Sequence, residues 1–217
     1  MADTPAFPVM PQSRASRVLA LPNLLTYGRI IAVPALVLSY YLQGYVGHWL
    51  SLAIFVAASV TDFLDGYLAR VWKLQSAIGR LLDPIADKLL VATALMLLVS
   101  DRTIGGWSLL PALIILTREI FVSGLREFLA ELRVSVPVSR LAKWKTTMQM
   151  VAIGLLLVGS AGNEIFPSIS WLTPVGIYVG PITYLGLTLL WISALVTLYT
   201  GYDYFRAGLR HLFEEDL

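Results

Sequence analysis

The segment TDFLDGYLARVWKLQSAIGRLLDPIADK, residues 61–88, holds four aspartates, Asp62, Asp65, Asp83 and Asp87, in a chain that is otherwise strongly apolar. Of the 217 residues, 57% are hydrophobic and only 14% are charged, whereas roughly a quarter of the residues in soluble domains are charged. This composition indicates an integral membrane protein. The acidic segment therefore lies between apolar stretches, where ionisable side chains are costly and usually functional.

Long apolar runs on both sides of this segment predict an all-α fold. A membrane-spanning helix needs about 20 mainly apolar residues, and six segments qualify: residues 25–43, 49–70, 81–100, 107–130, 144–162 and 182–205. LPNLLTYGR, residues 21–29, alternates in polarity and predicts a short N-terminal interfacial helix. Residues 1–17 are expected to form a disordered leader, and residues 18–217 a single membrane domain.

Basic residues are concentrated on one predicted side of the membrane. The links after the second and fourth spans hold Arg70, Lys73, Arg80, Arg133, Arg140, Lys143 and Lys145, whereas the opposite loops hold only Arg102. Basic loops favour the cytoplasm, so both termini are predicted to be cytoplasmic. The absence of cysteine excludes disulfides and thiolate sites. The net charge of +2 gives no reason to expect a nucleic-acid partner.

The four aspartates form two pairs on neighbouring predicted helices. Asp62 and Asp65 are three residues apart, and Asp83 and Asp87 are four apart, so each pair shares a helix face. The short link between the helices lets the pairs face each other. Facing carboxylates repel strongly at low dielectric, so either some are protonated or cations bind them. Their oxygens suit Mg²⁺, Mn²⁺ or Ca²⁺, and two such ions about 3.5–4 Å apart can clamp a phosphate during its displacement.

A salt-bridge cluster with Arg70, Arg80 and Lys88 is the structural alternative. It requires no fixed spacing and does not explain the small residues Gly66, Ala69 and Gly79 at helical offsets from the acids. Small residues let a ligand or another helix approach the backbone closely.

The pattern Asp62-x-x-Asp65-Gly66-x-x-Ala69-Arg70, eight further residues, then Gly79-x-x-x-Asp83-x-x-x-Asp87 resembles the signature of the CDP-alcohol phosphotransferase family at every fixed position. The resemblance implies a six-helix membrane enzyme, expected as a homodimer among membrane lipids, that transfers a phosphatidyl-type group from a CDP-linked lipid to an alcohol and releases CMP. It implies that two divalent ions, Mg²⁺ or Mn²⁺, are bound at Asp62, Asp65, Asp83 and Asp87. Asp87 is also implied to be the base that deprotonates the acceptor. The implied CDP-lipid site comprises Asn23, Thr26, Arg29, Asp62, Gly66, Ala69, Arg70 and Gly79.

Segments outside the aspartate motif narrow the acceptor. LPNLLTYGRI (residues 21–30), LTREIFVSGLREFLAE (116–131) and LAKWKTTMQMVAIGLLL (141–157) resemble the phosphatidylglycerophosphate synthases of this family. That resemblance implies CDP-diacylglycerol as the donor, sn-glycerol 3-phosphate as the acceptor, and the bacterial inner membrane as the location. The implied acceptor-phosphate site comprises Arg118, Arg126 and Lys143, with Lys145 as a further candidate.

The physical chemistry of these basic residues partly agrees with a phosphate-binding role. Phosphate recognition calls for Arg and Lys, and Arg118 and Arg126 are eight residues apart on one face of the fourth span. Arg118 lies inside an apolar run, where a charge needs a function. Arg126 and Lys143 have an alternative role, because basic residues at helix ends also extend to the interface and pair with lipid phosphates.

Three other functions remain open at this point. Phosphatidylinositol-phosphate, cardiolipin and phosphatidylserine synthases share the aspartate motif but differ in the segments outside it. A cation transporter also carries intramembrane aspartates, but it gives no reason for Gly66 and Ala69 or for a neighbouring basic pocket. An inactive scaffold would bind no nucleotide.

Overall fold

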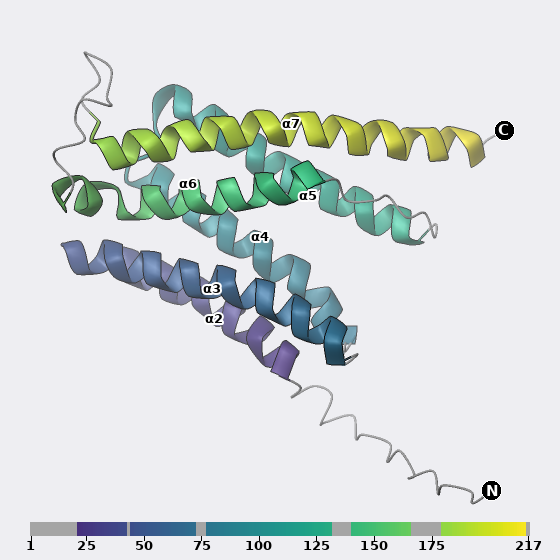
Figure 1. Ribbon diagram of the computed structural model, residues 1–217, viewed down its shortest axis with the longest axis horizontal. Coiled ribbons are helices and arrows are strands. Elements are labelled where there is room, and N and C mark those ends of the chain that lie inside the picture. The colour runs from purple at the N-terminus through teal and green to yellow at the C-terminus, as the bar shows by residue number, and fades with distance from the viewer. Residues whose placement is uncertain (1–20, 43, 73–76, 132–139, 166–178, 216–217) are drawn as a thin grey trace, which may run out of the picture.

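The computed structural model describes residues 21–42, 44–72, 77–131, 140–165 and 179–215 (Figure 1). These residues form the α-helices α2 (Leu21–Tyr40), α3 (Tyr45–Trp72), α4 (Ala77–Ser100), α5 (Leu109–Glu131), α6 (Arg140–Ile165) and α7 (Pro181–Glu215), and the 3-10 helix η1 (Gly106–Ser108). Each of the six predicted spans coincides with one α-helix, so the all-α prediction is confirmed for the described residues.

Four of these helices are long and apolar enough to cross a membrane: Asn23–Tyr40, Gly106–Ala130, Trp144–Ile165 and Pro181–Tyr202. The protein is therefore a membrane protein. The helices that carry the aspartates, α3 and α4, are not among the four, although they are 28 and 24 residues long. At about 1.5 Å per residue either helix is longer than the ~30 Å hydrocarbon core. The count of six spans stays a prediction.

The separate interfacial helix predicted over residues 21–29 is not confirmed. These residues form the first turns of α2, which continues without interruption to Tyr40. Gly28 within this stretch disfavours a helix by only about 1 kcal/mol relative to alanine, which does not end it. The predicted leader, residues 1–17, lies outside the described residues.

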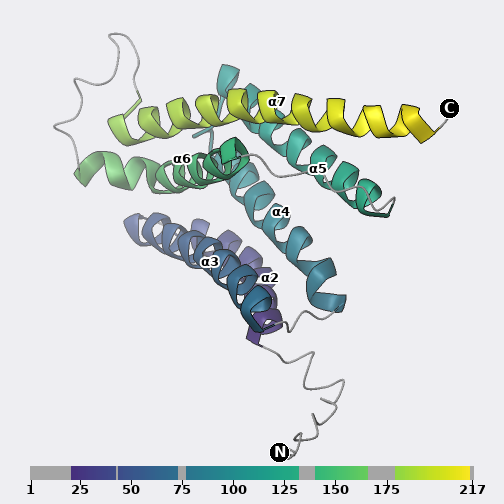
Figure 2. The same cartoon turned by 45° about the vertical axis from the view of Figure 1, so that its right-hand side comes forward.

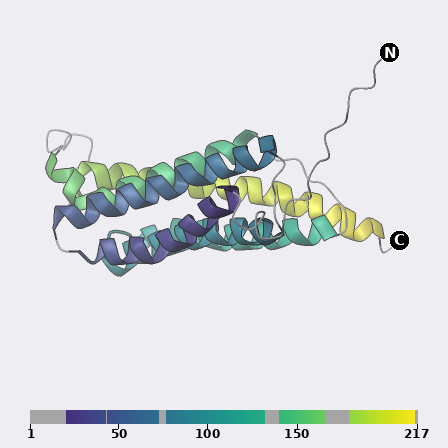
Figure 3. The same ribbon diagram turned by 90° about the horizontal axis from the view of Figure 1, so that it is seen from below.

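Successive helices run in opposite directions along the bundle (Figures 1 and 3). The start of α2, the end of α3, the start of α4, the end of α5 and the start of α6 consequently lie at one end, on the right in Figure 1. We call this the aspartate end, because Asp62, Asp83 and Asp87 lie in the parts of α3 and α4 nearest to it.

Two groups of three helices build the bundle (Figure 2). In one group α2 packs against α3 and α4, and in the other α7 packs against α5 and α6. Contacts of α3 with α6, and of α4 with α5 and α6, join the groups. One hydrophobic core runs through both, and its fully buried members include Leu36, Phe55, Leu98, Ile115 and Ile153. The groups thus bring acids from α3 and α4 close to basic residues from α5 and α6.

Asn163 near the end of α6 caps the start of α7. Its Oδ1 accepts hydrogen bonds from the backbone N–H groups of Ile182 (2.9 Å) and Thr183 (3.4 Å), and its Nδ2 donates to Thr183 Oγ1 (3.0 Å). These N–H groups have no partner within their own helix, so a side chain must satisfy them. The fit requires glycine at position 180, because a Cβ there would lie 2.1 Å from Asn163 Cγ.

We predict that Gly180→Ala displaces Asn163 and destabilises the protein by about 0.5–2 kcal/mol, the usual effect of losing a helix cap. Thermal unfolding in detergent measures the change. Gly124→Ala in α5 is the matched control, because a Cβ there has nothing within 4 Å and alanine favours a helix by up to about 1 kcal/mol over glycine. A Gly180→Ala protein that unfolds at the wild-type temperature contradicts the capping role.

Candidate functional site

Helix α2 presents a polar stripe to the aspartates of its neighbours. Asn23, Thr26 and Arg29 are three residues apart, so they share one helix face, and all three are at most 2% exposed. Arg29 Nη1 lies 2.6 Å from Asp62 Oδ1 of α3. Thr26 Oγ1 donates a hydrogen bond to Asp83 Oδ1 of α4. This stripe therefore fixes carboxylates from two other helices.

The structure brings three of the four predicted aspartates together. The Asp62 carboxylate interacts electrostatically with those of Asp83 and Asp87. The side chain of Asp65, like those of Gly66, Ala69 and Arg70, lies outside the described side chains. Gly79 is buried in the first turn of α4, one turn before Asp83.

The chemistry of this cluster suits a divalent cation. Asp62, Asp83 and Asp87 offer hard carboxylate oxygens. Within the described part of the chain, the cations that interact with them are Arg29, Lys88 and Lys145. Among the described side chains no group of three or more acidic or histidine residues is close enough to hold an ion, and Asp65 is not among those side chains. The carboxylate oxygens are the ligand type that a divalent cation prefers, and the sequence predicts Asp65 as the further ligand.

A basic cluster from the other helix group lies next to the acids. Lys145 of α6 donates a hydrogen bond to Glu119 of α5 and is 2% exposed. Arg118 Nη1 lies 3.7 Å from Glu119 Oε1, and Arg118 Nη2 donates to Thr200 Oγ1 of α7 at 3.3 Å. A Cβ at position 201 would lie 3.2 Å from Arg118 Cγ, so Gly201 makes room for the arginine.

The acidic and basic clusters form a single site around Asp87. Its carboxylate interacts electrostatically with Glu119 and with Lys145. Arg126 lies eight residues, or about 12 Å, along α5 from Arg118, and it is exposed. The side chain of Lys143 lies outside the described side chains. The structure therefore brings Lys145 close to Asp87, with Arg118 joined to the same cluster through Glu119, whereas the role of Arg126 stays a prediction.

Two contributors to this site were not identified from the sequence, namely Thr200 and Gly201. They lie more than 80 residues after Arg118 in an apolar helix, and nothing in their local pattern distinguishes them from ordinary helix residues. Glu119 follows Arg118 directly in the sequence. Its contact with Lys145 depends on the packing of both α5 and α6 against α7, which the sequence does not reveal.

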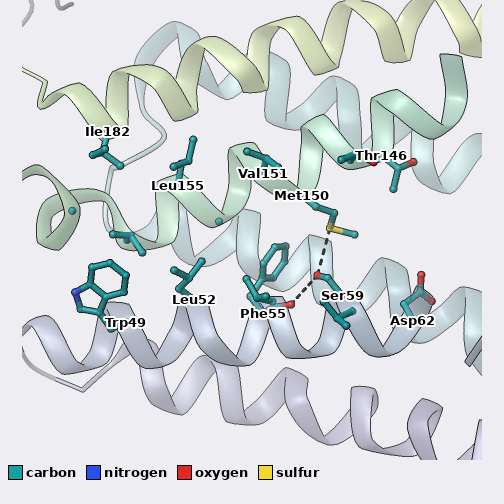
Figure 4. A pocket seen from close by; sticks show the side chains of 16 residues that line it. Trp49, Leu52, Phe55, Ser59, Asp62, Thr146, Met150, Val151, Leu155 and Ile182 are labelled. Atoms are coloured by element: carbon teal, nitrogen blue, oxygen red, sulfur yellow. Dashed lines mark hydrogen bonds between the residues drawn. The ribbon is translucent and has the colours of Figure 1, made fainter. Parts of the chain in front are cut away.

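An apolar groove of about 630 Å³ leads to the acids between α3 and α6 (Figure 4). Trp49 and Ile182 line one end of it, and Asp62 and Thr146 line the other. Between these ends the walls are mainly hydrophobic: Leu52, Phe55, Val56, Met150, Val151 and Leu155. The 13 residues from Trp49 to Asp62 span about 20 Å of helix. The groove is thus long and hydrophobic, with the carboxylate of Asp62 at one end.

Comparisons with known proteins agree with this combination of features. The family model described as CDP-alcohol phosphatidyltransferase matches residues 19–199. A protein of Rickettsia bellii is 46% identical over 86% of this chain and 94% of its own length. One of Cereibacter sphaeroides is 41% identical over 90% of this chain and 98% of its own. Both are named CDP-diacylglycerol–glycerol-3-phosphate 3-phosphatidyltransferase, as is a chloroplastic or mitochondrial relative of Arabidopsis thaliana, 43% identical over 74% of this chain and 56% of its own.

Proposed function

The chain belongs to the CDP-alcohol phosphatidyltransferase family, and on this basis we propose that it transfers the phosphatidyl group of CDP-diacylglycerol to sn-glycerol 3-phosphate. The products are phosphatidylglycerophosphate and CMP, so the enzyme acts in phospholipid biosynthesis. One observation carries the choice of acceptor: Asp87 interacts electrostatically with Asp62 and also with Lys145, which shares Glu119 with Arg118. An anionic acceptor would need such a pair beside a general base.

The groove between α3 and α6 matches the donor. CDP-diacylglycerol carries long acyl chains next to a charged diphosphate. The groove is apolar along its length and reaches Asp62 at one end, so an acyl chain fits along α3 with the diphosphate at the acids. Asn23, Thr26, Arg29, Gly66, Ala69, Arg70 and Gly79 complete the proposed CDP-lipid site.

We assign two divalent ions, Mg²⁺ or Mn²⁺, to Asp62, Asp65, Asp83 and Asp87. When bound, these ions would neutralise the charge of the diphosphate as its bond breaks. Two residues of α2 bind two of these carboxylates directly. Arg29 and Thr26 hold Asp62 and Asp83 in fixed positions, so little reorganisation is needed when substrate binds.

The chemical step is a displacement at the phosphatidyl phosphorus. Asp87 takes the proton from the terminal hydroxyl of the acceptor, and that oxygen forms a new bond to phosphorus. The bond between this phosphorus and the oxygen of CMP breaks, and CMP leaves with the electron pair. A general base must lie within hydrogen-bond reach of the proton it removes. Asp87 is assigned this role because it interacts electrostatically with Lys145 and Glu119, which belong to the proposed acceptor side of the site.

The acceptor phosphate is assigned to Arg118, Arg126, Lys143 and Lys145. Arg118 and Lys145 have the strongest support, because both are largely buried and both contact Glu119. Glu119 holds these two cations in place and balances part of their charge. Arg126 is exposed toward the aspartate end and would act at the entrance for the acceptor.

The expected topology follows from the same arrangement. The aspartate end receives the links that contain the basic residues, so we propose that it faces the cytoplasm, where a soluble acceptor and CMP are available. Six spans would place both termini on that side. The bacterial inner membrane, a homodimer and surrounding membrane lipids complete the proposal.

We predict that purified protein releases CMP from CDP-diacylglycerol with Mg²⁺ or Mn²⁺ when sn-glycerol 3-phosphate is supplied. Inositol phosphate and serine, added in turn, should give little CMP, because the buried basic pair fits a small phosphate-bearing acceptor. Preference for an acceptor without phosphate would contradict the assignment. A cation transporter or an inactive scaffold would release no CMP with any acceptor.

We further predict that Arg118→Ala raises the KM for glycerol 3-phosphate about ten- to a hundredfold, because a charge-assisted hydrogen bond contributes roughly 1.5–3 kcal/mol. The KM for CDP-diacylglycerol should change much less. Arg126→Ala should have a smaller effect, because its side chain is exposed and screened by solvent. Arg102→Asn is the control, since Arg102 lies at the opposite end with φ 65°, a conformation that asparagine tolerates. A change confined to the lipid substrate in Arg118→Ala would place this arginine outside the acceptor pocket.

A further inference from the structure

A small enclosed cavity of about 40 Å³ lies among α4, α5 and α6. Its polar lining comes from all three helices: Asp87, Lys88, Glu119, Thr146 and Gln149. Val91, Leu116, Ile120 and Met150 complete the lining with apolar side chains. A water molecule needs roughly 10–15 Å³ of cavity volume, so this cavity has room for a hydroxyl group and the carbon that carries it.

Gln149 is the polar residue in this lining whose bonding is incomplete. It is 2% exposed, and its Oε1 has no hydrogen-bond partner among the described residues. A buried carbonyl oxygen without a donor destabilises a protein, so such groups are rare and usually have a function. Gln149 Oε1 therefore requires a donor, and the cavity is the space from which one can come.

Gln149 lies at the depth of the reacting group. Asp87 is ten residues beyond the start of α4 at Ala77, and Gln149 is nine residues beyond the start of α6 at Arg140. Both helices begin at the aspartate end (Figure 1), so both residues lie about 14–15 Å into the bundle.

The residue one helical turn before Gln149 connects it to the acceptor-phosphate site. Lys145 and Gln149 are four residues apart on α6 and share a face. Lys145 is bound to Glu119, which also lines the cavity. An acceptor with its phosphate at Lys145 and its terminal hydroxyl at Asp87 would place its middle carbon beside this cavity.

We propose that Gln149 accepts a hydrogen bond from the middle hydroxyl of the acceptor and thereby selects a phosphorylated vicinal diol over a simple hydroxyalkyl phosphate. The assignment rests on the proposed function. Gln149 is a specificity-determining residue in this role, because it touches the substrate away from the reacting atoms. A site built to bond a hydroxyl discriminates against an analogue that lacks it, because its own buried group is then left without a partner.

The test compares two acceptors and two enzymes. The acceptors are sn-glycerol 3-phosphate and 3-hydroxypropyl phosphate, which lacks only the middle hydroxyl. We expect wild-type kcat/KM to be about tenfold or more higher for glycerol 3-phosphate. Gln149→Met keeps a similar size and removes the acceptor oxygen, so it should lower kcat/KM for glycerol 3-phosphate about tenfold and leave the analogue nearly unchanged.

Thr197→Val is the matched control. Thr197 Oγ1 is also buried without a hydrogen-bond partner among the described residues, but Thr197 lies on α7 and does not line the cavity. Its substitution should leave the ratio between the two acceptors at the wild-type value. A ratio that falls equally in Thr197→Val and Gln149→Met would overturn the assignment, because the effect would then belong to any buried polar substitution.

Two further results would also overturn it. If Gln149 only binds a structural water, Gln149→Met should lower the unfolding temperature and reduce activity equally with both acceptors. We expect the temperature to stay unchanged or rise, because the substitution removes a buried unpaired oxygen. The comparison of the two acceptors with the wild type tests the proposal even if the variant does not fold. Equal use of both acceptors would refute the role of Gln149 but leave the proposed function standing. No use of glycerol 3-phosphate would refute the proposed function itself.

Discussion

The ion pair between Arg29 and Asp62 joins α2 to α3 at 2.6 Å, with the arginine side chain fully buried. A buried guanidinium without a partner is strongly destabilising, so this pair constrains how the two helices dock. Thr26, one turn earlier on the same face, binds Asp83 and adds α4 to the same arrangement. The side chains of α2 that bind these carboxylates therefore also join α2 to α3 and α4. Asp62 and Asp83 cannot move apart without disrupting the packing of α2.

The second helix group, α5 to α7, supplies positively charged side chains near these aspartates. Arg118 is tolerated in an apolar run because Glu119 and Thr200 contact it and Gly201 leaves space for it. Lys145 shares the same glutamate. The contact between α3 and α6 then sets the distance between the groups, and the apolar groove along this contact ends at Asp62. The groove, the aspartates and the basic pair consequently meet at one end of the bundle.

The helices were predictable because long apolar runs leave few alternatives, and the aspartate spacing predicted which acids share a helix face. The N-terminal interfacial helix was not confirmed. The alternating polarity of residues 21–29 instead reflects polar contacts inside the bundle, since Asn23, Thr26 and Arg29 are buried. The burial of Lys145 was not predictable, because no sequence pattern distinguishes a buried lysine from an exposed one. Glu119, Gln149 and Thr200 gain their roles only through contacts between helices distant in the chain.

The carboxylates at the aspartate end are proposed to bind divalent ions together with a diphosphate. The number of Mn²⁺ ions bound per chain, measured by electron paramagnetic resonance with CDP present, tests this most directly. We expect two ions for the wild type, fewer for Asp83→Asn, and an unchanged two for Asp101→Asn, whose carboxylate lies at the opposite end beside Tyr40 and Thr103. A wild-type chain that binds no Mn²⁺ would show that the acids are held by protein contacts alone, and an Asp83→Asn chain that still binds two would contradict the assignment of Asp83 as a metal ligand.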